Sequence, residues 1–329
     1  MPKVSIIVPV YNAKDTLIKC VGSLVNQTLD DIEIILVNDC STDNSYLVMQ
    51  LLEQQFPEKI IIIDSDKNRG AGGARNIGLQ YATGEYIGFV DSDDEVATTM
   101  YEKLYNKANE ADFDIVDCGF YKEDEDLAII FTSDELAGTL NTSKRNELIA
   151  SGGYICSKIF KSSYWFKHNF TFRENAILED SEIIAYAMAT AKNIGNVKEI
   201  LYLYKNTPGS SSKTPDPKKY VTNCYNAIVA IHSALSSLDI YTEVREATEY
   251  EMIQMYSYAI NILLKNASSL PSKYILDELS KLQKFRNTYI SPGYDNKYVN
   301  AKIQSADINI MVMNDSSPNQ LLNKYIEKT

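Results

Sequence analysis

Four short apolar runs, each ending in polar residues, shape the first 90 residues of the chain. The runs are Val4–Pro9, Glu33–Val37, Lys59–Ile63 and Glu85–Val90. Each run is too short for a typical helix and is rich in Val and Ile on both faces, which is characteristic of buried parallel strands. Because segments with helical spacing fill the intervals, the sequence predicts a doubly wound α/β sheet with functional loops beyond the carboxyl ends of its strands.

The intervening helices are expected from the spacing of apolar side chains. In the first interval Asn12 is a candidate N-cap, and the apolar residues that follow at helical spacing are Leu17, Cys20, Val21, Leu24 and Val25. The same pattern recurs over residues 45–52 and 74–81. Three such intervals give the strand and helix alternation of parallel β–α–β units.

Beyond Asp91 the pattern changes to a mixed α+β extension. A helix is predicted over residues 98–111 and a strand over 115–121, and the apolar spacing is helical for nearly all of the chain after Pro217. We therefore expect an α/β domain over residues 1–213 and an α-helical C-terminal domain over residues 214–329. The turn-rich segment 207–213 between them is either a linker or a mobile loop that faces the substrate.

Charge and cysteine content narrow the classes of function. The net charge is −12, which disfavours nucleic-acid binding. The acidic residues are concentrated in residues 1–200, where 32 acidic and 18 basic side chains give a net charge of −14. The five cysteines form no C-x-x-C pair, so neither a disulfide framework nor a zinc site is predicted. With no apolar run near the roughly 20 residues of a membrane span, we expect a cytoplasmic protein, free or at the inner face of the membrane.

Polar clusters follow all four predicted strands, where a doubly wound sheet places its ligand. The most acidic is Asp91-Ser92-Asp93-Asp94, which places three carboxylates in four residues. Such a cluster is costly unless a cation neutralises it, and Mg²⁺ or Mn²⁺ prefers one or two carboxylates together with phosphate oxygens. The alternative is a solvated acidic turn that caps the next helix.

A glycine-rich segment follows the third strand. Residues 68–76 read Asn-Arg-Gly-Ala-Gly-Gly-Ala-Arg-Asn, which matches neither the dinucleotide fingerprint nor the P-loop. A flexible turn before a helix is the alternative interpretation. Arg75 is one of few basic residues in an acidic domain, and it could pair with pyrophosphate or with the carboxylate cluster.

Five linked motifs over about 95 residues resemble family 2 glycosyltransferases of the GT-A fold. They are Val4–Asn12, Ser23-Leu24 with Gln27-Thr28, Val37–Asp43, Asn68-Arg69-Gly70 with Ala74-Arg75-Asn76-x-Gly78, and Asp91–Asp94. The resemblance continues more weakly through Glu179-Asp180 and Pro208-Gly209-Ser210. Two positions depart from the family's pattern, because Asn38 stands where Asp is frequent and Cys40 where Gly is frequent.

The resemblance implies a set of donor-binding residues. Asp39 would accept a hydrogen bond from uracil, Arg75 would lie near the base or phosphates, and Asp91 would face the ribose. Asp93 would bind Mn²⁺ or Mg²⁺ at the diphosphate of a UDP-sugar, with Asp91 and Asp94 as further candidates for the metal site. The remaining nucleotide-binding candidates are Pro9 and Tyr11, which would frame base and ribose, and Asn12, Asn68 and Ser92.

Glu179 and Asp180 occupy the family's Glu-Asp position, where the resemblance implies a general base. Asp180 is the better candidate, because a carboxylate beside another carboxylate can have a raised pKa that suits proton abstraction. The alternative is a helix N-terminus, where acidic residues are favoured and after which Ile183, Ile184 and Ala187 continue at helical spacing.

Taken together, these residues predict an inverting, metal-dependent hexosyltransferase. It would move a sugar from a UDP-linked donor to a hydroxyl of a glycan or lipid-linked acceptor in cell-surface polysaccharide or glycoconjugate synthesis. A nucleotidyltransferase that makes activated sugars and a non-catalytic sugar-binding protein are the alternatives. The helical tail either shapes acceptor access or forms a homodimer, and the candidate stripe for a dimer is Ile253, Tyr256, Ile260 and Leu263. The sequence does not identify the sugar, the acceptor or the linkage.

Overall fold

The computed structural model describes residues 1–207, 216–290, 296–304 and 318–326. It divides into two compact units. The first contains Met1–Lys144 and Gly153–Pro208, and the second contains Arg145–Gly152 and Gly209–Thr329. No helix among the described residues is both long enough and apolar enough to cross a membrane.

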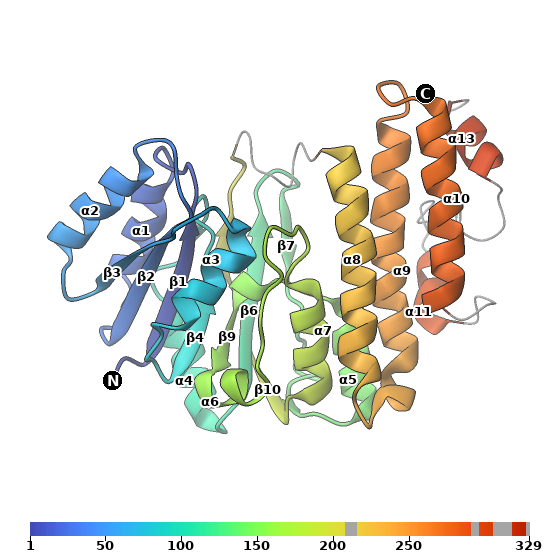
Figure 1. Cartoon of the computed structure of the whole chain (residues 1–329). Helices are drawn as coiled ribbons and strands as arrows, with labels where there is room; N and C mark the ends of the chain where they lie inside the picture. Colours follow the sequence, from blue (N-terminus) through green and yellow to red (C-terminus); the bar gives the residue numbers. More distant parts are fainter. Residues whose placement is uncertain (208–215, 291–295, 305–317, 327–329) are drawn as a thin grey trace. The chain divides into compact units, whose positions relative to one another are not determined.

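The first unit is built on one ten-stranded sheet (Figure 1). Its main path runs in the order β3-β2-β1-β4-β9-β6-β10-β5, with β7 paired to β6 and β8 to β10. The strands are β1 (Val4–Val10), β2 (Ile32–Asn38), β3 (Ile60–Asp64), β4 (Tyr86–Phe89), β5 (Glu95–Val96), β6 (Ile115–Lys122), β7 (Leu127–Ile129), β8 (Gly138–Thr139), β9 (Lys158–Lys161) and β10 (Asn193–Tyr204).

The predicted runs form four neighbouring parallel strands. β1 pairs in parallel with β2 and β4, and β2 pairs in parallel with β3. β9 then pairs antiparallel with both β4 and β6, and this reversal makes the sheet mixed. Ile6, Ile7 and Val8 of β1 are fully buried, as expected for a central strand covered on both faces.

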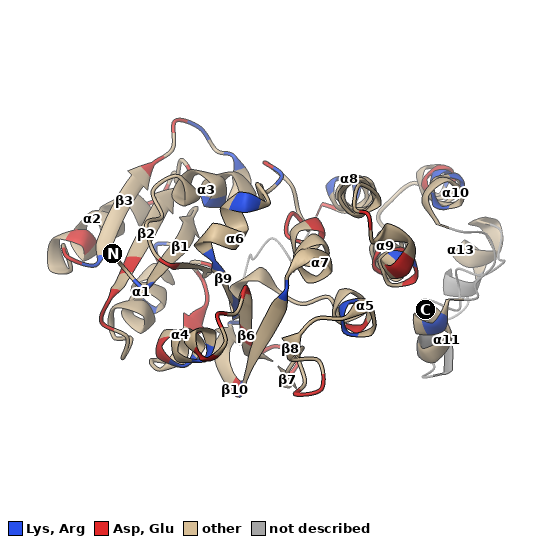
Figure 2. Cartoon of the chain, turned by 90° about the horizontal axis from the view of Figure 1, so that it is seen from below, with Lys and Arg blue, Asp and Glu red and all other residues tan. Residues whose placement is uncertain are grey.

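Helices cover both faces of this sheet (Figure 2), with α3 and α6 on one face and α1 and α4 on the other. The helices of the first unit are α1 (Leu17–Val25), α2 (Ser45–Gln55), α3 (Gly70–Leu79), α4 (Met100–Glu110), α6 (Ser162–Lys167) and α7 (Ser181–Thr190), with the short 3₁₀ helix η1 (Ile155–Ser157). Thr16, not Asn12, is the N-cap of α1. Asn12 instead adopts a positive φ of 50°, a conformation that suits a turn residue.

α3 begins at Gly70, so the glycine-rich segment is not the flexible turn that the composition suggested. Its glycines are needed for close packing. A β-carbon at Gly72 would stand 2.4 Å from the carbonyl oxygen of Arg173, and one at Gly78 would stand 2.6 Å from Ile7. Helix propensity disfavours glycine in this position, but only glycine lets the neighbouring chain approach so closely.

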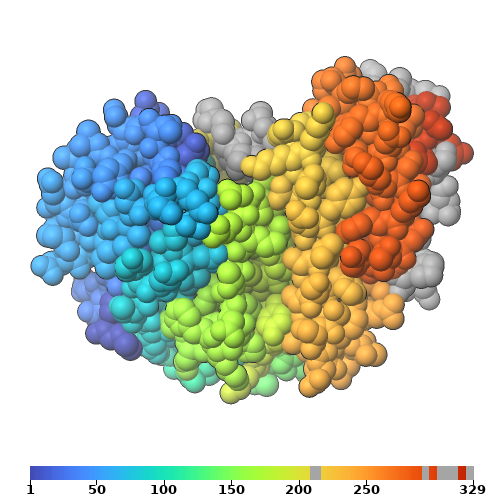
Figure 3. Space-filling model, viewed as in Figure 1, coloured from blue at the N-terminus to red at the C-terminus, as the bar shows by residue number. Residues whose placement is uncertain are grey.

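The second unit is helical (Figure 1), and its helices after residue 216 are coloured from yellow to red in the space-filling view (Figure 3). Its helices are α5 (Thr142–Ser151), which starts in the first unit, α8 (Pro217–Ser236), α9 (Tyr241–Lys265), α10 (Ser272–Tyr289), α11 (Lys297–Gln304) and α13 (Pro318–Ile326). The Asp216 carboxylate caps α8 by accepting from Lys218 N at 2.9 Å, and Pro217 occupies the first turn. α5 is tied to α9 because Asn146 Nδ2 donates to Glu243 O at 2.9 Å.

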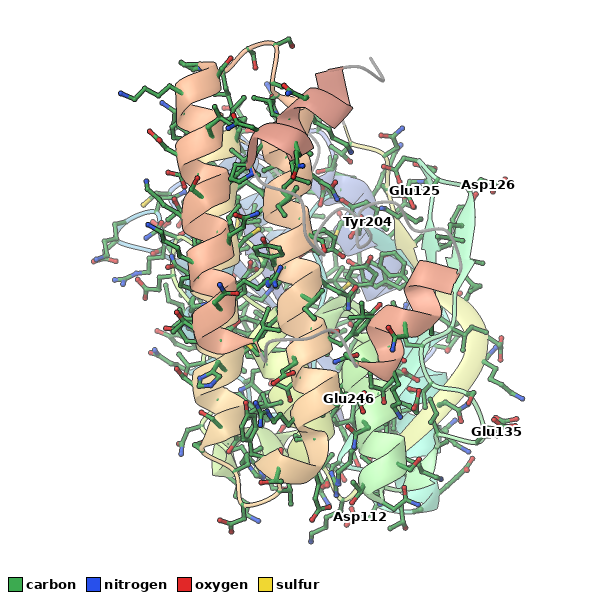
Figure 4. The ribbon with its side chains drawn as sticks, turned by 90° about the vertical axis from the view of Figure 1, so that its right-hand side faces the viewer. Asp112, Glu125, Asp126, Glu135, Tyr204 and Glu246 are labelled. Atoms are coloured by element: carbon green, nitrogen blue, oxygen red, sulfur yellow. The ribbon has the colours of Figure 1, made fainter. Side chains whose placement is uncertain are left out.

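α9 is the central helix of this unit and packs against α8, α10 and α11. Figure 4 labels Glu246 on α9, whose carbonyl oxygen accepts from Asn296 Nδ2 at 2.7 Å and whose carboxylate accepts from Lys297 N at 2.6 Å. The stripe proposed as a dimer surface is buried, since Ile253, Tyr256, Ile260 and Leu263 are at most 2% exposed. The stripe is therefore core and not an interface.

Candidate active site

The polar ends of β1, β2, β3 and β4 lie at one edge of the sheet. Asp39 N donates to Val10 O at 2.8 Å, and Ser65 N donates to Asn38 O at 2.9 Å, so the ladders continue beyond the last strand residues. Asn38 Nδ2 also donates to Asp64 Oδ1 at 2.7 Å. The predicted clusters are thus brought together as parallel strands require.

Asp39 is buried at the start of the loop after β2, with 2% of its surface exposed. Its Oδ1 accepts from Arg69 N at 2.7 Å, and its carbonyl oxygen accepts from Asn68 Nδ2 at 3.0 Å. Burial raises the pKa of Asp39, and the backbone hydrogen bonds from Arg69 and Gly70 oppose that shift. Asp39 and Asn68 therefore fix the entry into α3.

The three candidate residues at the end of β1 have different surroundings. Pro9 is buried within the strand opposite Val37, whereas Tyr11 is 50% exposed beside it. The Asn12 side chain joins two loops, because its Oδ1 accepts from Thr42 N at 2.7 Å. Tyr11 is thus accessible to a ligand, whereas Pro9 is not.

Arg75 on α3 bridges two carboxylates from distant parts of the chain. Its Nη2 lies 2.6 Å from Asp91 Oδ1, and its Nη1 lies 2.5 Å from Glu179 Oε1. The guanidinium is 5.3 Å from the centre of the Phe172 ring, and Arg75 as a whole is 4% exposed. The sequence left two partners open for Arg75, a pyrophosphate or the carboxylate cluster. In the structure Arg75 forms ion pairs with carboxylates.

The segment 172–179 reaches Arg75 because it is docked on α3. Asn76 Nδ2 donates to Phe172 O at 2.8 Å and Asn76 Oδ1 accepts from Phe172 N at 2.9 Å, which satisfies both backbone groups. Asn175 N donates to Arg69 O at 2.6 Å. Leu178 has a positive φ of 61°, which is unfavourable for a branched apolar residue and is typical of strained functional segments.

Asp180 takes the N-cap position of α7, but its side chain makes no capping hydrogen bond. Burial raises the pKa of Asp180 to about 7, the charge of Glu179 adds to this effect, and Arg75 opposes it. A carboxylate that titrates near neutrality is suited to accept a proton at physiological pH. The raised pKa of Asp180 suits a general base, and its role as the base stays a prediction.

The three carboxylates after β4 are not equivalent. Asp91 is held by Arg75, whereas Asp94 is 1% exposed and accepts from Tyr202 Oη at 2.6 Å and Lys205 N at 2.8 Å. Burial raises the pKa of Asp94 to about 8, and the charge of Asp91 adds to the shift. Asp94 thus links the β4 loop to the end of β10.

Within the described residues no cluster of three or more acidic, histidine or cysteine side chains forms a ready metal cage. Asp93 lies in the same loop and is partly exposed. Mg²⁺ and Mn²⁺ need only one or two carboxylates when phosphate oxygens and water complete the shell. The donor set at Asp93 fits a metal ion that arrives with a diphosphate.

Several contacts of the site could not be found from the sequence. Tyr202 Oη donates to Asp94 and accepts from Asp91 N at 3.3 Å, across more than one hundred residues. Thr16 Oγ1 donates to the carbonyl oxygen of Ser92 at 3.0 Å. Neither Tyr202 nor Thr16 stands in a motif, so only the tertiary structure reveals them.

Comparisons with known proteins indicate the family of the chain. The family described as glycosyl transferase family 2 matches residues 5–173. The glycosyltransferase EpsJ of Bacillus subtilis is 34% identical over 226 residues, which cover 65% of this chain and 64% of EpsJ. The minor teichoic acid biosynthesis protein GgaB of the same species is 29% identical over 277 residues, which cover 81% of this chain and 30% of GgaB. The chain thus spans less than two thirds of each of these relatives.

The fold is shared with a solved structure. The crystal structure of Staphylococcus aureus TarS 1–349 in complex with UDP-GlcNAc superposes with a TM-score of 0.65 at 20% identity, over 92% of each chain. This likeness confirms the predicted GT-A fold followed by a helical region. With its family match extending over residues 5–173 of 329, the chain belongs to glycosyl transferase family 2.

Proposed function

We propose that the protein transfers a hexose-type sugar from a UDP-linked donor to a hydroxyl of a glycan or glycolipid, with inversion at the anomeric carbon. The observation that carries this proposal is the Arg75 bridge between Asp91 and Glu179. One buried guanidinium binds both the loop after β4, where the donor would bind, and the segment that leads to Asp180. It would therefore hold the two at a fixed separation. A shared anchor of this kind would fix the distance between donor and base, which is what a single displacement requires.

The donor would be bound by the strand-end residues. The buried Asp39 would accept from the uracil N3–H, and Tyr11 would pack on the base or ribose. UDP-GlcNAc in the TarS structure supports a uridine nucleotide. Mn²⁺ or Mg²⁺, held by Asp93 and the diphosphate oxygens, would supply positive charge that stabilises the leaving group.

Asp180 would act on the acceptor. As the acceptor oxygen attacks the anomeric carbon, its proton passes to the Asp180 carboxylate, and the bond from that carbon to the diphosphate oxygen breaks with its electron pair on UDP. Attack from the face opposite the diphosphate inverts the configuration. Arg75 would act as a positioning residue, because both of its terminal nitrogens are already bound to carboxylates.

The nucleotidyltransferase alternative is disfavoured by the same geometry. That chemistry would use a basic, glycine-rich loop after the first strand, whereas Asn12 there is tied to the loop after β2. A β-carbon at Gly72 would stand 2.4 Å from Arg173 O and one at Gly73 would stand 2.3 Å from Arg69 Cβ, so these two glycines leave no room for a phosphate. Family membership favours sugar transfer as well.

The relatives support a proposal for the acceptor and the cellular setting. GgaB takes part in teichoic acid biosynthesis, which supports a role in making a cell-surface polymer. The helical domain, taken as residues 214–329, would shape access of the acceptor or mediate self-association. We propose that the enzyme acts in the cytoplasm, where nucleotide sugars are made. It would lie at or near the inner face of the membrane.

The test is release of UDP and transfer from UDP-GlcNAc, UDP-glucose and UDP-galactose, each with Mn²⁺ and with EDTA. At least one donor should be hydrolysed slowly in Mn²⁺, and Asp180→Asn should bind UDP normally while transferring roughly 10²–10⁴-fold more slowly. Glu58→Gln, which changes an exposed carboxylate after α2, is the matched control and should behave as the wild type. Absence of both UDP binding and UDP release with every donor would contradict the proposal.

A further inference from the structure

Tyr202 is a fully buried residue of β10 whose hydroxyl binds both ends of the Asp91–Asp94 loop after β4. The residue is 0% exposed, and its Oη donates to Asp94 Oδ2 at 2.6 Å and accepts from Asp91 N at 3.3 Å. Within the loop Asp94 N donates to Asp91 O at 3.0 Å. One hydroxyl from a distant strand therefore braces a turn that is already closed by its own backbone.

The strand that carries Tyr202 is irregular at this point. The parallel pairing of β10 with β6 shifts register twice, between Val197 and Ile200 and between Ile200 and Tyr202. Irregularities of this kind re-aim the side chain beside them and are frequent next to active sites. The Tyr202 ring is also held by Phe120, which is 2% exposed and stacks on it with centroids 5.5 Å apart and planes inclined by 4°. Both features fix the place of the hydroxyl.

The backbone of the same loop is also bound from α1. Thr16 occupies the N-cap of α1 but makes no capping hydrogen bond, although a threonine there usually satisfies a free N–H of the helix. Its Oγ1 instead lies 3.0 Å from Ser92 O, with a longer contact of 3.3 Å to Ala13 O. Cys20 Sγ donates to Asp91 O at 3.4 Å. Side chains from two elements thus bind the backbone of one short loop.

Asp93 lies between residues that these contacts hold. It is partly exposed, and its neighbours Ser92 and Asp94 are bound by Thr16 and Tyr202. A metal site that takes only one or two carboxylates from the protein has few ligands to order it. A loop that is shaped before the ion arrives loses less conformational freedom on binding. Groups that orient metal ligands in this way are typically worth roughly 10–100-fold in metal affinity.

We propose that the hydroxyl groups of Tyr202 and Thr16 are positioning groups for the metal: they hold the Asp91–Asp94 loop in the conformation in which Asp93 binds Mn²⁺ or Mg²⁺. The inference rests on the proposed function, because the ion is expected at Asp93 only together with the diphosphate of the donor. Neither hydroxyl is itself a metal ligand. Metal affinity therefore depends on β10, a strand outside the family motifs of the donor site.

Tyr202→Phe on the full chain tests the proposal, because it removes the hydroxyl and keeps the stacked ring. Electron paramagnetic resonance of free Mn²⁺ measures Mn²⁺ affinity in the presence of UDP, and calorimetry measures UDP affinity in EDTA. We expect Mn²⁺ affinity to fall by roughly 10–100-fold and UDP affinity in EDTA to equal that of the wild type. Tyr86→Phe is the matched control. Tyr86 is also 0% exposed, but its Oη donates to Phe113 O at 3.1 Å, so both affinities should stay unchanged.

Thr16 provides a second pair of variants, which keeps the proposal testable if Tyr202→Phe does not fold. Thr16→Val keeps the shape of the side chain and removes the donor, whereas Thr16→Ser keeps the donor. Mn²⁺ affinity should fall in Thr16→Val and be retained in Thr16→Ser. A purely structural role of Thr16 or Tyr202 would instead change UDP affinity in EDTA and in Mn²⁺ alike.

The outcomes separate this inference from the proposed function. If the wild type binds UDP and Mn²⁺ but Tyr202→Phe and Thr16→Val bind Mn²⁺ equally well, the hydroxyl groups do not position the loop, while the transferase proposal stands. Equal losses of UDP affinity in EDTA and in Mn²⁺ would overturn the inference in the same way. If the wild type binds UDP but no Mn²⁺, the inference fails together with the metal assignment of Asp93. If the wild type binds no UDP under either condition, the transferase proposal itself fails.

Discussion

Gly72 in α3 lies so close to Glu179 that a β-carbon at position 72 would stand 3.0 Å from the Glu179 Cγ atom. The same β-carbon would be 2.4 Å from the carbonyl oxygen of Arg173. Backbone at this distance cannot move aside by a rotamer change. The missing side chain at Gly72 therefore sets where the segment before α7 lies, and with it the reach of Glu179 to Arg75.

Gly72→Ala is expected to displace that segment and slow transfer by roughly 10²-fold, the usual cost of misplacing a reacting group by about 1 Å. UDP affinity, measured by calorimetry, should change little because Asp39 and Tyr11 lie on other loops. Gly22→Ala in α1 is the control, since nothing lies within 4 Å of its added β-carbon. A Gly72→Ala enzyme with wild-type kcat would show that the close approach does not position the base.

Removal of the Arg75 guanidinium should cost stability. Arg75→Met leaves Glu179, whose side chain is 12% exposed, without its cation, and we expect the free energy of unfolding to fall by about 3 kcal/mol in urea. Glu179→Gln combined with Arg75→Met should recover part of that loss. Arg69→Met is the control: its partners Asp66 and Glu174 are 75% and 43% exposed, so its loss should cost about 1 kcal/mol or less. An equal loss of unfolding free energy in Arg75→Met and Arg69→Met would show that the buried Arg75 ion pairs stabilise the fold no more than the exposed ones of Arg69.

Asp180 should give transfer a pH dependence. Because its pKa is raised to about 7, the rate should rise with pH up to that value and then level off, as the base loses its proton. Asp180→Asn should slow transfer by roughly 10²–10⁴-fold and abolish that rise. Full activity in Asp180→Asn would show that Asp180 is not the general base. Glu179 would then be the next residue to test.

The same shift has a consequence for stability with a definite sign. Between the ordinary pKa of 3.8 and about 7, the folded chain holds a proton at Asp180 that the unfolded chain releases, so stability falls as pH rises through this window. Asp180→Asn should therefore raise Tm relative to the wild type at pH 8 and have little effect near pH 4. A Tm difference that is independent of pH would argue against the raised pKa.

Asp39 should contribute to donor affinity through its carboxylate. Asp39→Asn keeps an oxygen for Arg69 N but presents an amide that can no longer serve as a charged acceptor for uracil. The expected loss of UDP affinity is about 1–3 kcal/mol by calorimetry. Asp66→Asn, on an exposed neighbouring side chain, is the control and should bind UDP as the wild type does. Unchanged UDP binding in Asp39→Asn would remove it from the nucleotide site.

Asp93 should matter only when metal is present. EDTA should abolish transfer, added Mn²⁺ or Mg²⁺ should restore it, and Asp93→Asn should weaken UDP binding in Mn²⁺ but not in EDTA. Asp31→Asn, whose side chain is 64% exposed, serves as the control. Transfer by Asp93→Asn in the presence of chelator would exclude the metal role.

The sequence predicted what depends on local pattern. β1 to β4 and the helices between them follow from the apolar runs and their spacing, because buried parallel strands and amphipathic helices have distinct periods. It did not predict the place of β9, whose four residues lie between β4 and β6 only because of tertiary pairing. Nor did it predict that residues 145–152 belong with the helical unit, since α5 has no marked pattern of its own.

The sequence singled out candidate site residues but did not indicate the contacts between them. Asp180 and Arg75 stand in recognisable motifs, yet the ion pair that joins Arg75 to Glu179 spans 104 positions and leaves no local signal. The resemblance made Asp94 a further candidate for the metal site, and that role stays a prediction. The structure adds that Asp94 accepts hydrogen bonds from Tyr202 Oη and Lys205 N, which no local pattern in the sequence indicates.

Trp165, the single tryptophan of the chain, is 1% exposed and packs against Phe89 at 5.2 Å and Phe172 at 5.8 Å. Phe172 is also the ring beneath Arg75, so the indole borders the segment that leads to Asp180. Its fluorescence is therefore a natural reporter of the first unit alone, while circular dichroism at the helical minimum follows both units. Coincident denaturation curves from the two signals would mean that the units unfold as one cooperative system, and separated curves would measure how much each stabilises the other.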